Sequence, residues 1–325
     1  MTAVLELQNV QKQFGGRPAV RGVSLAVEQG AIFGFLGPNG AGKTTSLRMA
    51  LGIIEPDAGS ALLFGKRPSA ESLDRVGFLP EERGLYRKMK CEDIIVYFAR
   101  LKGMHADAAR LRARELLQRF GLADYARRKV KDLSKGMAQK IQVLAAVVHN
   151  PDLVILDEPF SGLDPVNQSA LEDLVRDLAA QGRTVIFSTH VMEHAERLCD
   201  RIALIAGGRK IFDGGVREAL AHCPRWVEIE APKQSDMDGV AAALGAVAER
   251  SDHVCDDPED IRWRLVLPKA IEPQAALRAC LSRGVDVRLF EPHRPRLRDA
   301  FVQLVGDDDA AQLRTEGAAL QGDAA

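Results

Sequence analysis

The chain has 325 residues, of which 46% are hydrophobic and 27% charged. These values are ordinary for soluble globular proteins, and they exclude a wholly disordered chain or a fibrous repeat. The 44 Lys and Arg residues nearly cancel the 45 Asp and Glu residues, so bulk charge gives no reason to expect a nucleic-acid partner. The length favours about two domains.

Neither export nor membrane insertion is indicated by the sequence. There is no apolar run of about 18 residues, and the N-terminus lacks the basic head and apolar core of an export signal. The five cysteines are far apart and form no C-x-x-C pair, so neither a disulfide framework nor a zinc site is expected. A cytoplasmic protein with reduced thiols is the plain expectation.

The first third of the chain alternates short apolar runs with turn residues. Val4 to Val10 predicts a strand. Ala31 to Leu36 is nearly continuous in apolar residues, which is typical of a strand buried on both faces. A glycine-rich loop comes next, and a helix is expected from about Thr44 to Leu51, closed by Gly52.

The pattern becomes helical between about Lys88 and Asn150, where Ser134 is a favourable N-cap for the last helix. Strand patterns return at Leu153–Leu156 and Val185–Ser188. Two further apolar runs flank Gly207–Gly208, as in a hairpin. The order predicts an α/β core over residues 1–215 with an inserted helical subdomain at about 88–150.

The pattern changes again near residue 216. Strands and helices alternate in the order β-α-β-β-α-β, the split pattern of small ferredoxin-like α/β modules. The strands are expected at Trp226–Glu230, near His253, at Ile261–Leu267 and at Val285–Leu289, and the helices at Val240–Val247 and Gln274–Arg283. We therefore predict a C-terminal accessory α/β domain at 216–305, closed by a helix at Leu297–Val305, and a flexible tail at 306–325.

A phosphate-binding loop is the strongest motif. It has the pattern G-x-x-x-x-G-K-S/T, comes after a buried strand and precedes a helix, as a phosphate loop requires. Its glycines let the backbone N–H groups face phosphates, Lys43 is expected to reach the β and γ phosphates, and the Thr44 hydroxyl to bind Mg²⁺. The expected nucleotide contacts are Gly37, Pro38, Asn39, Gly40, Ala41, Gly42, Lys43, Thr44 and Thr45.

Polar residues end two later strands. Asp157 and Glu158 come directly after Leu153–Leu156, and His190 comes after the strand that ends near Thr189. Ligands of α/β sheets bind at this carboxyl edge, so Asp157 is expected to hold Mg²⁺ and Glu158 to polarise an attacking water. Acids at strand ends are often only caps and a lone histidine is often structural, but a neighbouring phosphate loop favours function. At this edge of the sheet, His190 is a candidate sensor of the γ phosphate.

With these motifs in place, the chain resembles the ATP-binding cassette family, the nucleotide-binding subunits of ABC transporters. Leu133-Ser134-Lys135-Gly136-Met137 is similar to that family's signature sequence, and Ser161-Gly162-Leu163-Asp164 to the loop after its catalytic glutamate. His190 matches the family's switch histidine. Phe14 stands 29 positions before Lys43, where the family places an aromatic ring that stacks on adenine.

The resemblance covers about residues 3–215. It implies a P-loop NTPase cassette fold, ATP and Mg²⁺ as cofactors, and hydrolysis by a homodimer or a heterodimer with a second cassette. It also implies that ATP lies between the phosphate loop of one copy and the signature residues Ser134, Lys135 and Gly136 of the other. Asp164 then couples the two sites. On the same resemblance, the chain works at the inner face of the cell membrane through a separate transmembrane permease.

Three positions depart from the family pattern. Lys135 replaces the signature's usual first glycine, and Met137 its usual glutamine. Glu81 stands where the family has a glutamine that senses the γ phosphate, and a carboxylate cannot donate hydrogen bonds as an amide does. We expect the loop around Glu81 still to contact the permease. That loop, the signature and the C-terminal module resemble exporter-type ATPases of sodium and drug efflux.

Two other interpretations stay open. The first is a soluble, non-transport ABC ATPase. A DNA-repair type would need a long coiled coil between Lys43 and Ser134, and a translation type two cassettes, so only a cluster-assembly type remains. That type would leave the C-terminal domain unexplained. The second is an interaction module with a dead site, which the presence of Lys43, Asp157, Glu158 and His190 disfavours.

Overall fold

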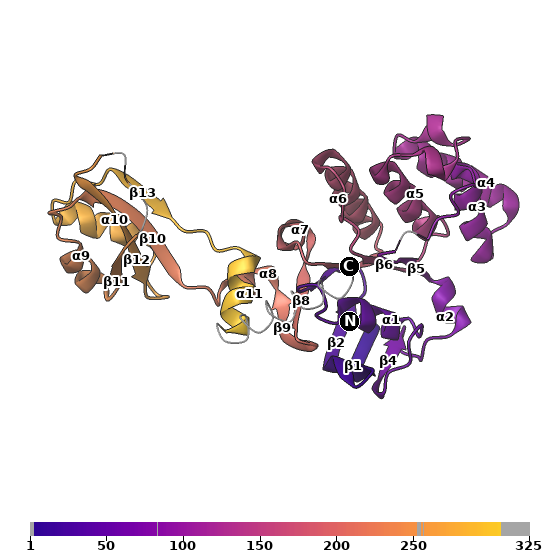
Figure 1. The fold of residues 1–325 in the computed structure, drawn as a ribbon, viewed down its shortest axis with the longest axis horizontal. Coiled ribbons are helices and arrows are strands. Elements are labelled where there is room, and N and C mark those ends of the chain that lie inside the picture. Colours follow the sequence, from indigo (N-terminus) through magenta and orange to yellow (C-terminus); the bar gives the residue numbers. More distant parts are fainter. Residues whose placement is uncertain (1–2, 83, 252–254, 256, 307–325) are drawn as a thin grey trace. The chain divides into compact units, whose positions relative to one another are not determined.

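The computed structural model describes residues 3–82, 84–251, 255 and 257–306. They form two compact units, divided between Val216 and Arg217, with residues 304–306 grouped with the first unit (Figure 1). The strand expected near His253 and the tail expected at 307–325 lie outside the described residues. Each unit is described by itself.

An antiparallel sheet opens the first unit. Its strand order is β2-β1-β4. The bounds are β1 (Ala3–Phe14), β2 (Arg17–Glu28) and β4 (Ala58–Leu63). The strand predicted at Val4–Val10 lies inside β1, whereas β2, with its alternation of exposed and buried residues, was not predicted.

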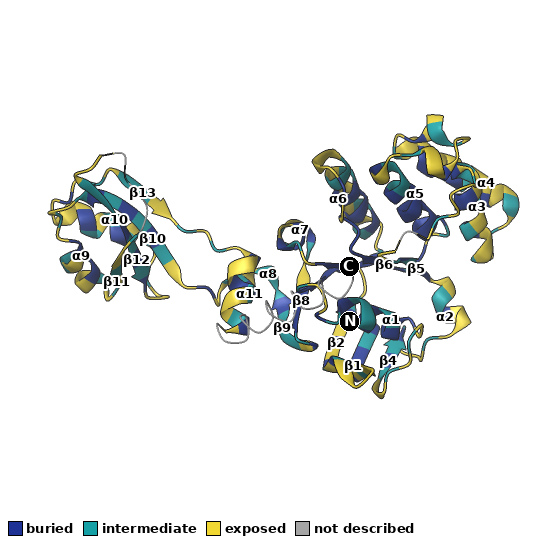
Figure 2. Cartoon of the chain, viewed as in Figure 1, coloured by how far each residue is buried: buried dark blue, intermediate teal, exposed yellow. Residues whose placement is uncertain are grey.

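A six-stranded sheet, of order β5-β6-β7-β3-β8-β9, forms the centre of this unit. All its pairings are parallel except that of β9 with β8. Strands β3, β6 and β7 are buried along their whole length, as their apolar runs predict. Figure 2 shows the burial of the chain, with β6 among the dark blue segments. Because these three strands are parallel, their carboxyl ends meet at one edge. The bounds are β3 (Ile32–Leu36), β5 (Val76–Leu79), β6 (Leu153–Asp157), β7 (Thr184–Thr189), β8 (Arg201–Ala206) and β9 (Arg209–Gly215).

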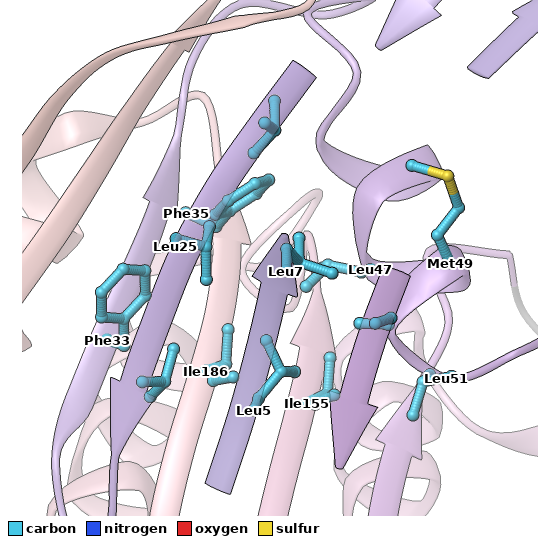
Figure 3. Close-up of a cluster of buried hydrophobic side chains, with 14 of the residues drawn as sticks. Leu5, Leu7, Leu25, Phe33, Phe35, Leu47, Met49, Leu51, Ile155 and Ile186 are labelled. Carbon is cyan, nitrogen blue, oxygen red and sulfur yellow. The ribbon is translucent and has the colours of Figure 1, made fainter. Parts of the chain in front are cut away.

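One hydrophobic core joins the two sheets and helix α1 (Lys43–Ala50). Figure 3 shows Leu5 and Leu7 of β1 facing Ile155 and Ile186 of the central sheet, with Leu47 of α1 beside them. The phosphate-loop helix is thus fixed by packing on both sheets. The other helices of this part are α2 (Ala70–Asp74), α6 (Pro165–Ala180) and α7 (Met192–Leu198), whereas α8 (Val216–Leu220) starts at the boundary with the second unit.

A helical subdomain is inserted between β5 and β6. It contains α3 (Cys91–Leu101), α4 (Ala106–Arg119), α5 (Lys135–Val147) and two short 3₁₀ turns, Ala123–Tyr125 and Val130–Asp132. These helices share their own core, in which Ile94, Leu117 and Ile141 are fully buried. Ser134 caps α5 as expected, but the helix ends at Val147 and not at Asn150, whose backbone is left-handed.

The second unit is a four-stranded antiparallel sheet of order β11-β12-β10-β13 with two helices between its strands. This is the ferredoxin-like arrangement that the β-α-β-β-α-β order predicts. Two limits differ from expectation. Val247 starts β11 and is not part of the preceding helix, and the last strand starts at Leu289 and not at Val285. The bounds are β10 (Arg225–Pro232), α9 (Met237–Leu244), β11 (Val247–Arg250), β12 (Asp260–Leu267), α10 (Pro273–Ser282), β13 (Leu289–Pro292) and α11 (Leu297–Val305).

Candidate active site

The loop from Gly37 to Thr44 connects β3 to α1 and passes very close to two other backbone segments. A Cβ atom on Gly37 would lie 2.1 Å from the carbonyl oxygen of Ile205, and one on Gly42 would lie 2.4 Å from that of Ala19. Gly42 also has a φ of 97°, a conformation that favours glycine. The motif's glycines are therefore required by close backbone approach.

The Lys43 side chain is enclosed by this loop and is only 5% exposed. Its ammonium group donates hydrogen bonds to the carbonyl oxygens of Gly37, at 2.8 Å, and Pro38, at 3.1 Å. The Nζ atom also lies 3.3 Å from Oε1 of Glu158. The phosphate loop and the acidic end of β6 thus meet at one buried cation.

Asp157 lies at the end of β6, next to the start of α1. Its Oδ1 atom accepts hydrogen bonds from the Thr44 hydroxyl, at 3.2 Å, and from the Ser188 hydroxyl. Its Oδ2 atom is buried and has no hydrogen-bond partner among the described residues. A buried, unpaired carboxylate oxygen beside a threonine hydroxyl suits Mg²⁺, which prefers hard oxygen ligands. The pair Thr44 and Asp157 therefore fits the metal that the sequence predicts.

Glu158 has a left-handed backbone with a φ of 47°, which is uncommon for a residue other than glycine. Its N–H group donates to the hydroxyl of Ser188, at 3.0 Å, and to the Ser188 carbonyl, at 3.2 Å. Its Oε2 atom lies 3.0 Å from Nδ1 of His190. The side chain is 7% exposed, whereas that of His190 is 43% exposed. Strain of this kind is typical of functional sites.

The signature segment and the Asp164 loop are in contact within the chain. Ser134 caps α5 by accepting a hydrogen bond from the N–H group of Met137, at 3.2 Å. A Cβ atom on Gly136 would lie 2.6 Å from Nδ2 of Asn167, and this amide donates to Oδ2 of Asp164, also at 2.6 Å. The Asn167 hydrogen bonds, from backbone and side chain, hold the pKa of Asp164 below its usual value.

Two glutamines of α5 connect the helical subdomain to the site, and neither was predicted from the sequence. Gln139 is buried and donates to the carbonyl oxygen of Pro159, at 3.2 Å, directly after Glu158. Gln142 is also buried and donates to the Glu82 carbonyl, at 3.3 Å. A polar side chain on the buried face of a helix needs a partner, and this is the signal that could have found them.

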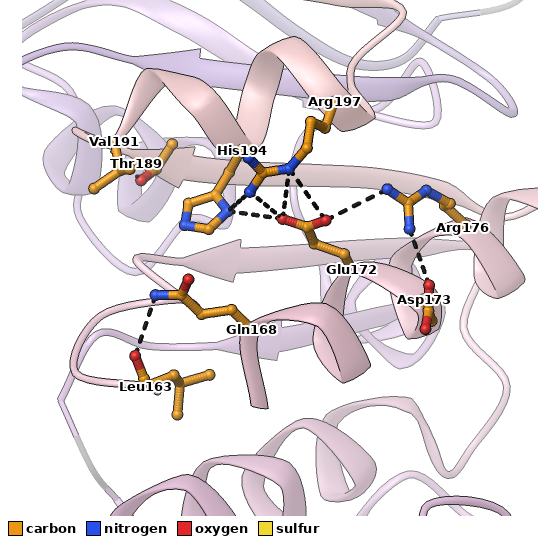
Figure 4. A network of polar contacts seen from close by, with 9 residues as sticks. All are labelled: Leu163, Gln168, Glu172, Asp173, Arg176, Thr189, Val191, His194 and Arg197. Carbon is orange, nitrogen blue, oxygen red and sulfur yellow. Dashed lines mark hydrogen bonds and ion pairs between the residues drawn. The ribbon is translucent and has the colours of Figure 1, made fainter. Parts of the chain in front are cut away.

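A second polar network joins α6 to α7 (Figure 4). The buried carboxylate of Glu172 lies 2.9 Å from Nδ1 of His194 and accepts hydrogen bonds from Arg197. Burial raises the pKa of Glu172, but its hydrogen bonds with Arg197 and His194 outweigh this and hold the pKa below the usual value. The His194 ring stacks on Phe160, with centroids 4.0 Å apart. The residues after Glu158 and after His190 are thereby packed together.

Other expected site residues stand apart from this centre. Phe14 ends β1 and is 50% exposed, with the Lys12 ammonium 5.8 Å from its ring centroid. Its hairpin reaches the phosphate loop through Ala19. Glu81 and Lys135 are exposed, and no hydrogen bond or ion pair of their side chains is found within the described ranges. The structure thus brings together Lys43, Thr44, Asp157, Glu158 and His190, but not Phe14, Glu81 or Lys135.

A phosphate loop at the edge of a parallel sheet, with carboxylates on the adjoining strand and a helical insertion that carries the signature, defines a nucleotide-binding protein of the cassette type. The family model described as "ABC transporter" matches residues 20–161. An uncharacterized ABC transporter ATP-binding protein, YhaQ of Bacillus subtilis, is 46% identical over 93% of this chain and 99% of its own length. The chain belongs to the ATP-binding proteins of ABC transporters, as the signature and phosphate loop predict.

Further relatives agree with the family and the fold class. Nod factor export ATP-binding protein I of Burkholderia lata is 36% identical, over 94% of this chain and 97% of its own length. A solved ATP-binding subunit of an ABC transporter is 29% identical with a TM-score of 0.62, over 66% of this chain and 91% of that chain. The cbiO1 protein of Clostridium perfringens, part of the transporter complex cbiONQ, is 25% identical with a TM-score of 0.61, over 68% of this chain and 92% of that one. Within the described ranges, no helix is long and apolar enough to cross a membrane.

Proposed function

We propose that the chain binds and hydrolyses ATP as one half of a cassette dimer that drives a separate membrane permease, in the direction of export. The observation that carries the proposal is the meeting of Lys43, the unpaired Oδ2 atom of Asp157 and the buried carboxylate of Glu158 at one sheet edge. The export-named relative from Burkholderia lata supports the direction.

Each residue of the site has its own role in this proposal. Lys43 and the backbone N–H groups of its loop bind the phosphates of ATP, and Phe14 offers an exposed ring for the base. Thr44 and Asp157 hold Mg²⁺, and the charge of this ion offsets the repulsion between the phosphate oxygens and the nearby carboxylates. Glu158 takes a proton from the attacking water, and His190 keeps its carboxylate oriented.

The position of Ser134 supports the dimer. This residue caps α5, whose N-terminus carries a partial positive charge suited to phosphate. The signature serves the ATP of the second copy, and the contact from Gly136 through Asn167 to Asp164 relates it to the neighbouring site. Residues 216–305 form an accessory domain that supports the dimer or regulates it.

The permease is proposed to bind the helical subdomain, which places the chain at the cytoplasmic face of the membrane. A hollow of about 430 Å³ lies along α3. It is lined by Met89, Val96, Tyr97 and Leu101 and by the charged residues Asp93, Arg100 and Arg110. Leu101 is 61% exposed, and so is available to a partner. The loop with Glu81 precedes this surface and is proposed to contact the permease as well.

A mixing experiment tests the dimer and the roles of both motifs. Ser134→Arg spoils the signature but keeps the phosphate loop, and Lys43→Ala does the reverse. If the chain forms homodimers, the mixed dimer has one site with both defects and one with neither. We expect each variant alone to hydrolyse ATP at a small fraction of the wild-type rate, and activity to return on mixing. Full activity of Ser134→Arg alone would contradict a signature that acts on the partner's ATP.

A further inference from the structure

Positive charge is concentrated in the helical subdomain. Residues 88–150 contain 14 Lys and Arg but only 6 Asp and Glu, whereas the whole chain has 44 and 45. The near-zero net charge of the chain therefore conceals a strongly basic part and an acidic remainder. A charge asymmetry of this kind points to an anionic partner for the basic part.

Backbone hydrogen bonds bring the most basic stretches side by side, next to the start of α3. The N–H group of Lys131 donates to the carbonyl of Arg87, and that of Cys91 to the carbonyl of Arg128, each at 3.0 Å. Lys90 and Lys129 form a β-bridge. The result is a basic cluster of seven exposed side chains: Arg87, Lys88, Lys90, Arg127, Arg128, Lys129 and Lys131.

The cluster is not neutralised by the chain itself. Two acids of the neighbouring helices pair with other cations: Glu92 lies 2.8 Å from Arg114, and Glu115 lies 3.2 Å from Arg112. Asp132, next to Lys131, is the one acid in the two basic stretches 87–90 and 127–132, so its single negative charge stands against seven positive charges. Within the described ranges, no ion pair is found for any of the seven side chains. Like charges directly opposed across a bridge, as at Lys90 and Lys129, repel each other. The fold therefore maintains a repulsion that a bound anionic surface would relieve.

The form of the cluster favours a bilayer over a shaped ligand. Its side chains are long and spread over two exposed segments, and the neighbouring hollow along α3 combines apolar side chains with two further cations, Arg100 and Arg110, and one acid, Asp93. Clusters of about four to eight Lys and Arg are typical of segments that bind anionic lipids. Tyr86, next to Arg87, is 54% exposed and supplies a ring of the kind enriched at membrane interfaces.

We propose that the basic cluster binds the anionic lipid headgroups of the membrane. Such binding would hold the helical subdomain at the bilayer and present the loop around Glu81, a few residues before Arg87, to a membrane protein. This goes beyond the proposed function. Vesicle binding needs neither ATP nor a permease, so the two proposals can fail separately.

The test measures co-sedimentation of the full chain with vesicles of phosphatidylcholine, either alone or with about a third phosphatidylglycerol. One variant carries Lys88→Gln, Lys90→Gln, Arg127→Gln and Lys129→Gln. Its matched control removes the same charge from exposed positions elsewhere, with Arg17→Gln, Lys66→Gln, Arg67→Gln and Arg209→Gln. Circular dichroism and thermal unfolding check that both variants fold. A salt titration of vesicle binding by the wild-type chain is a second test, which does not depend on the folding of any variant.

The wild-type chain should bind the anionic vesicles, dissociate from them as the salt concentration is raised, and not bind neutral vesicles. The cluster variant should bind at least about tenfold more weakly, because each cation near such a surface contributes about 1 kcal/mol. The control should change by less than about twofold. Equal binding to neutral vesicles, or equal losses in both variants, overturns the proposal. Binding to a duplex oligonucleotide in place of anionic vesicles overturns it as well, by assigning the cluster to nucleic acid.

Discussion

The carboxylate of Glu158 lies between two cationic or potentially cationic groups: its Oε2 atom is 3.0 Å from Nδ1 of His190, and its Oε1 atom is 3.3 Å from Nζ of Lys43. The three residues come from the ends of β6 and β7 and from the start of α1. Glu158 is therefore contacted from both sides by groups of its own chain. A fixed carboxylate of this kind suits the removal of a proton from water.

Replacement of Glu158 by Gln should keep ATP binding and slow turnover by about 10²- to 10⁴-fold, since loss of a general base typically has this effect. The measurement is the initial rate of phosphate release, with ATP affinity from calorimetry. Glu193→Gln, an exposed carboxylate in the first turn of α7, is the control and should turn over normally. A Glu158→Gln protein with near-normal turnover would remove Glu158 from this role.

Replacement of Lys43 by Ala should weaken ATP binding by about 10- to 100-fold, because a hydrogen bond to a charged group contributes about 1.5–3 kcal/mol. The buried ammonium already lies inside the loop, held by the carbonyls of Gly37 and Pro38. Calorimetric titration with ATP measures the change, and Lys66→Ala, an exposed lysine, is the control. Unchanged affinity in Lys43→Ala would contradict the assignment of the phosphate loop.

The elements predicted best are strands whose sequence pattern indicates burial on both faces. Leu153–Leu156 and Ala31–Leu36 are continuous apolar runs, and both are fully buried parallel strands. The phosphate loop is equally well predicted from the sequence, because close backbone approach at Gly37 and Gly42 requires glycine. Burial on both faces and close backbone approach each restrict the residue types within a short segment, so both can be recognised from that segment alone.

The parts that were missed depend on contacts between distant segments. Ser188 forms hydrogen bonds with both Asp157 and Glu158, and Gln139 donates a hydrogen bond to the carbonyl oxygen of Pro159. The sequence around Ser188 and around Gln139 does not indicate these distant partners. The bounds of the last strand were predicted wrongly for a related reason. Val285 is buried in the core of the second unit without sheet pairing, so its apolar spacing resembles a strand, whereas pairing with β10 starts only at Leu289.

Acid should destabilise the chain partly through His149, near the end of α5. Burial lowers the pKa of this histidine to about 4, and its Nε2 atom lies 3.3 Å from the Val76 carbonyl. In the unfolded chain the pKa is about 6.5. Between these values the unfolded state binds a proton that the folded state does not, so stability is complete above about pH 6.5 and falls as the pH decreases toward 4.

Urea unfolding midpoints at several pH values between about 4.5 and 7.5 measure this effect. His149→Gln should lose stability less steeply than the wild-type chain as the pH falls, whatever its stability at neutral pH. His105→Gln, at an exposed position, is the control for the loss of a histidine as such, and its slope is compared with that of His149→Gln. Parallel slopes for His149→Gln and the wild-type chain would show that His149 does not titrate in this way.

Glu172 should contribute to stability through the network between α6 and α7. Its carboxylate is buried and accepts from Arg197, with His194 at 2.9 Å and Arg176 at 3.4 Å. Glu172→Gln leaves the buried His194 ring and Arg197 without a charged acceptor. We expect a loss of about 1–3 kcal/mol in the free energy of unfolding, less than for a fully dry pair because Arg197 is half exposed.

The control is Asp173→Asn, which removes the neighbouring exposed partner of Arg176 and should cost under about 0.5 kcal/mol. A double-mutant cycle of Glu172→Gln with His194→Gln then isolates their coupling, which we expect to exceed about 0.5 kcal/mol. The pH dependence has a definite sign. Because the pKa of Glu172 is held below its usual value, its stabilisation is present above the unfolded-state pKa of about 4.3 and is lost as the pH falls below that. Additive effects in the cycle would contradict the network, and the stacking of His194 on Phe160 would then be only a packing contact.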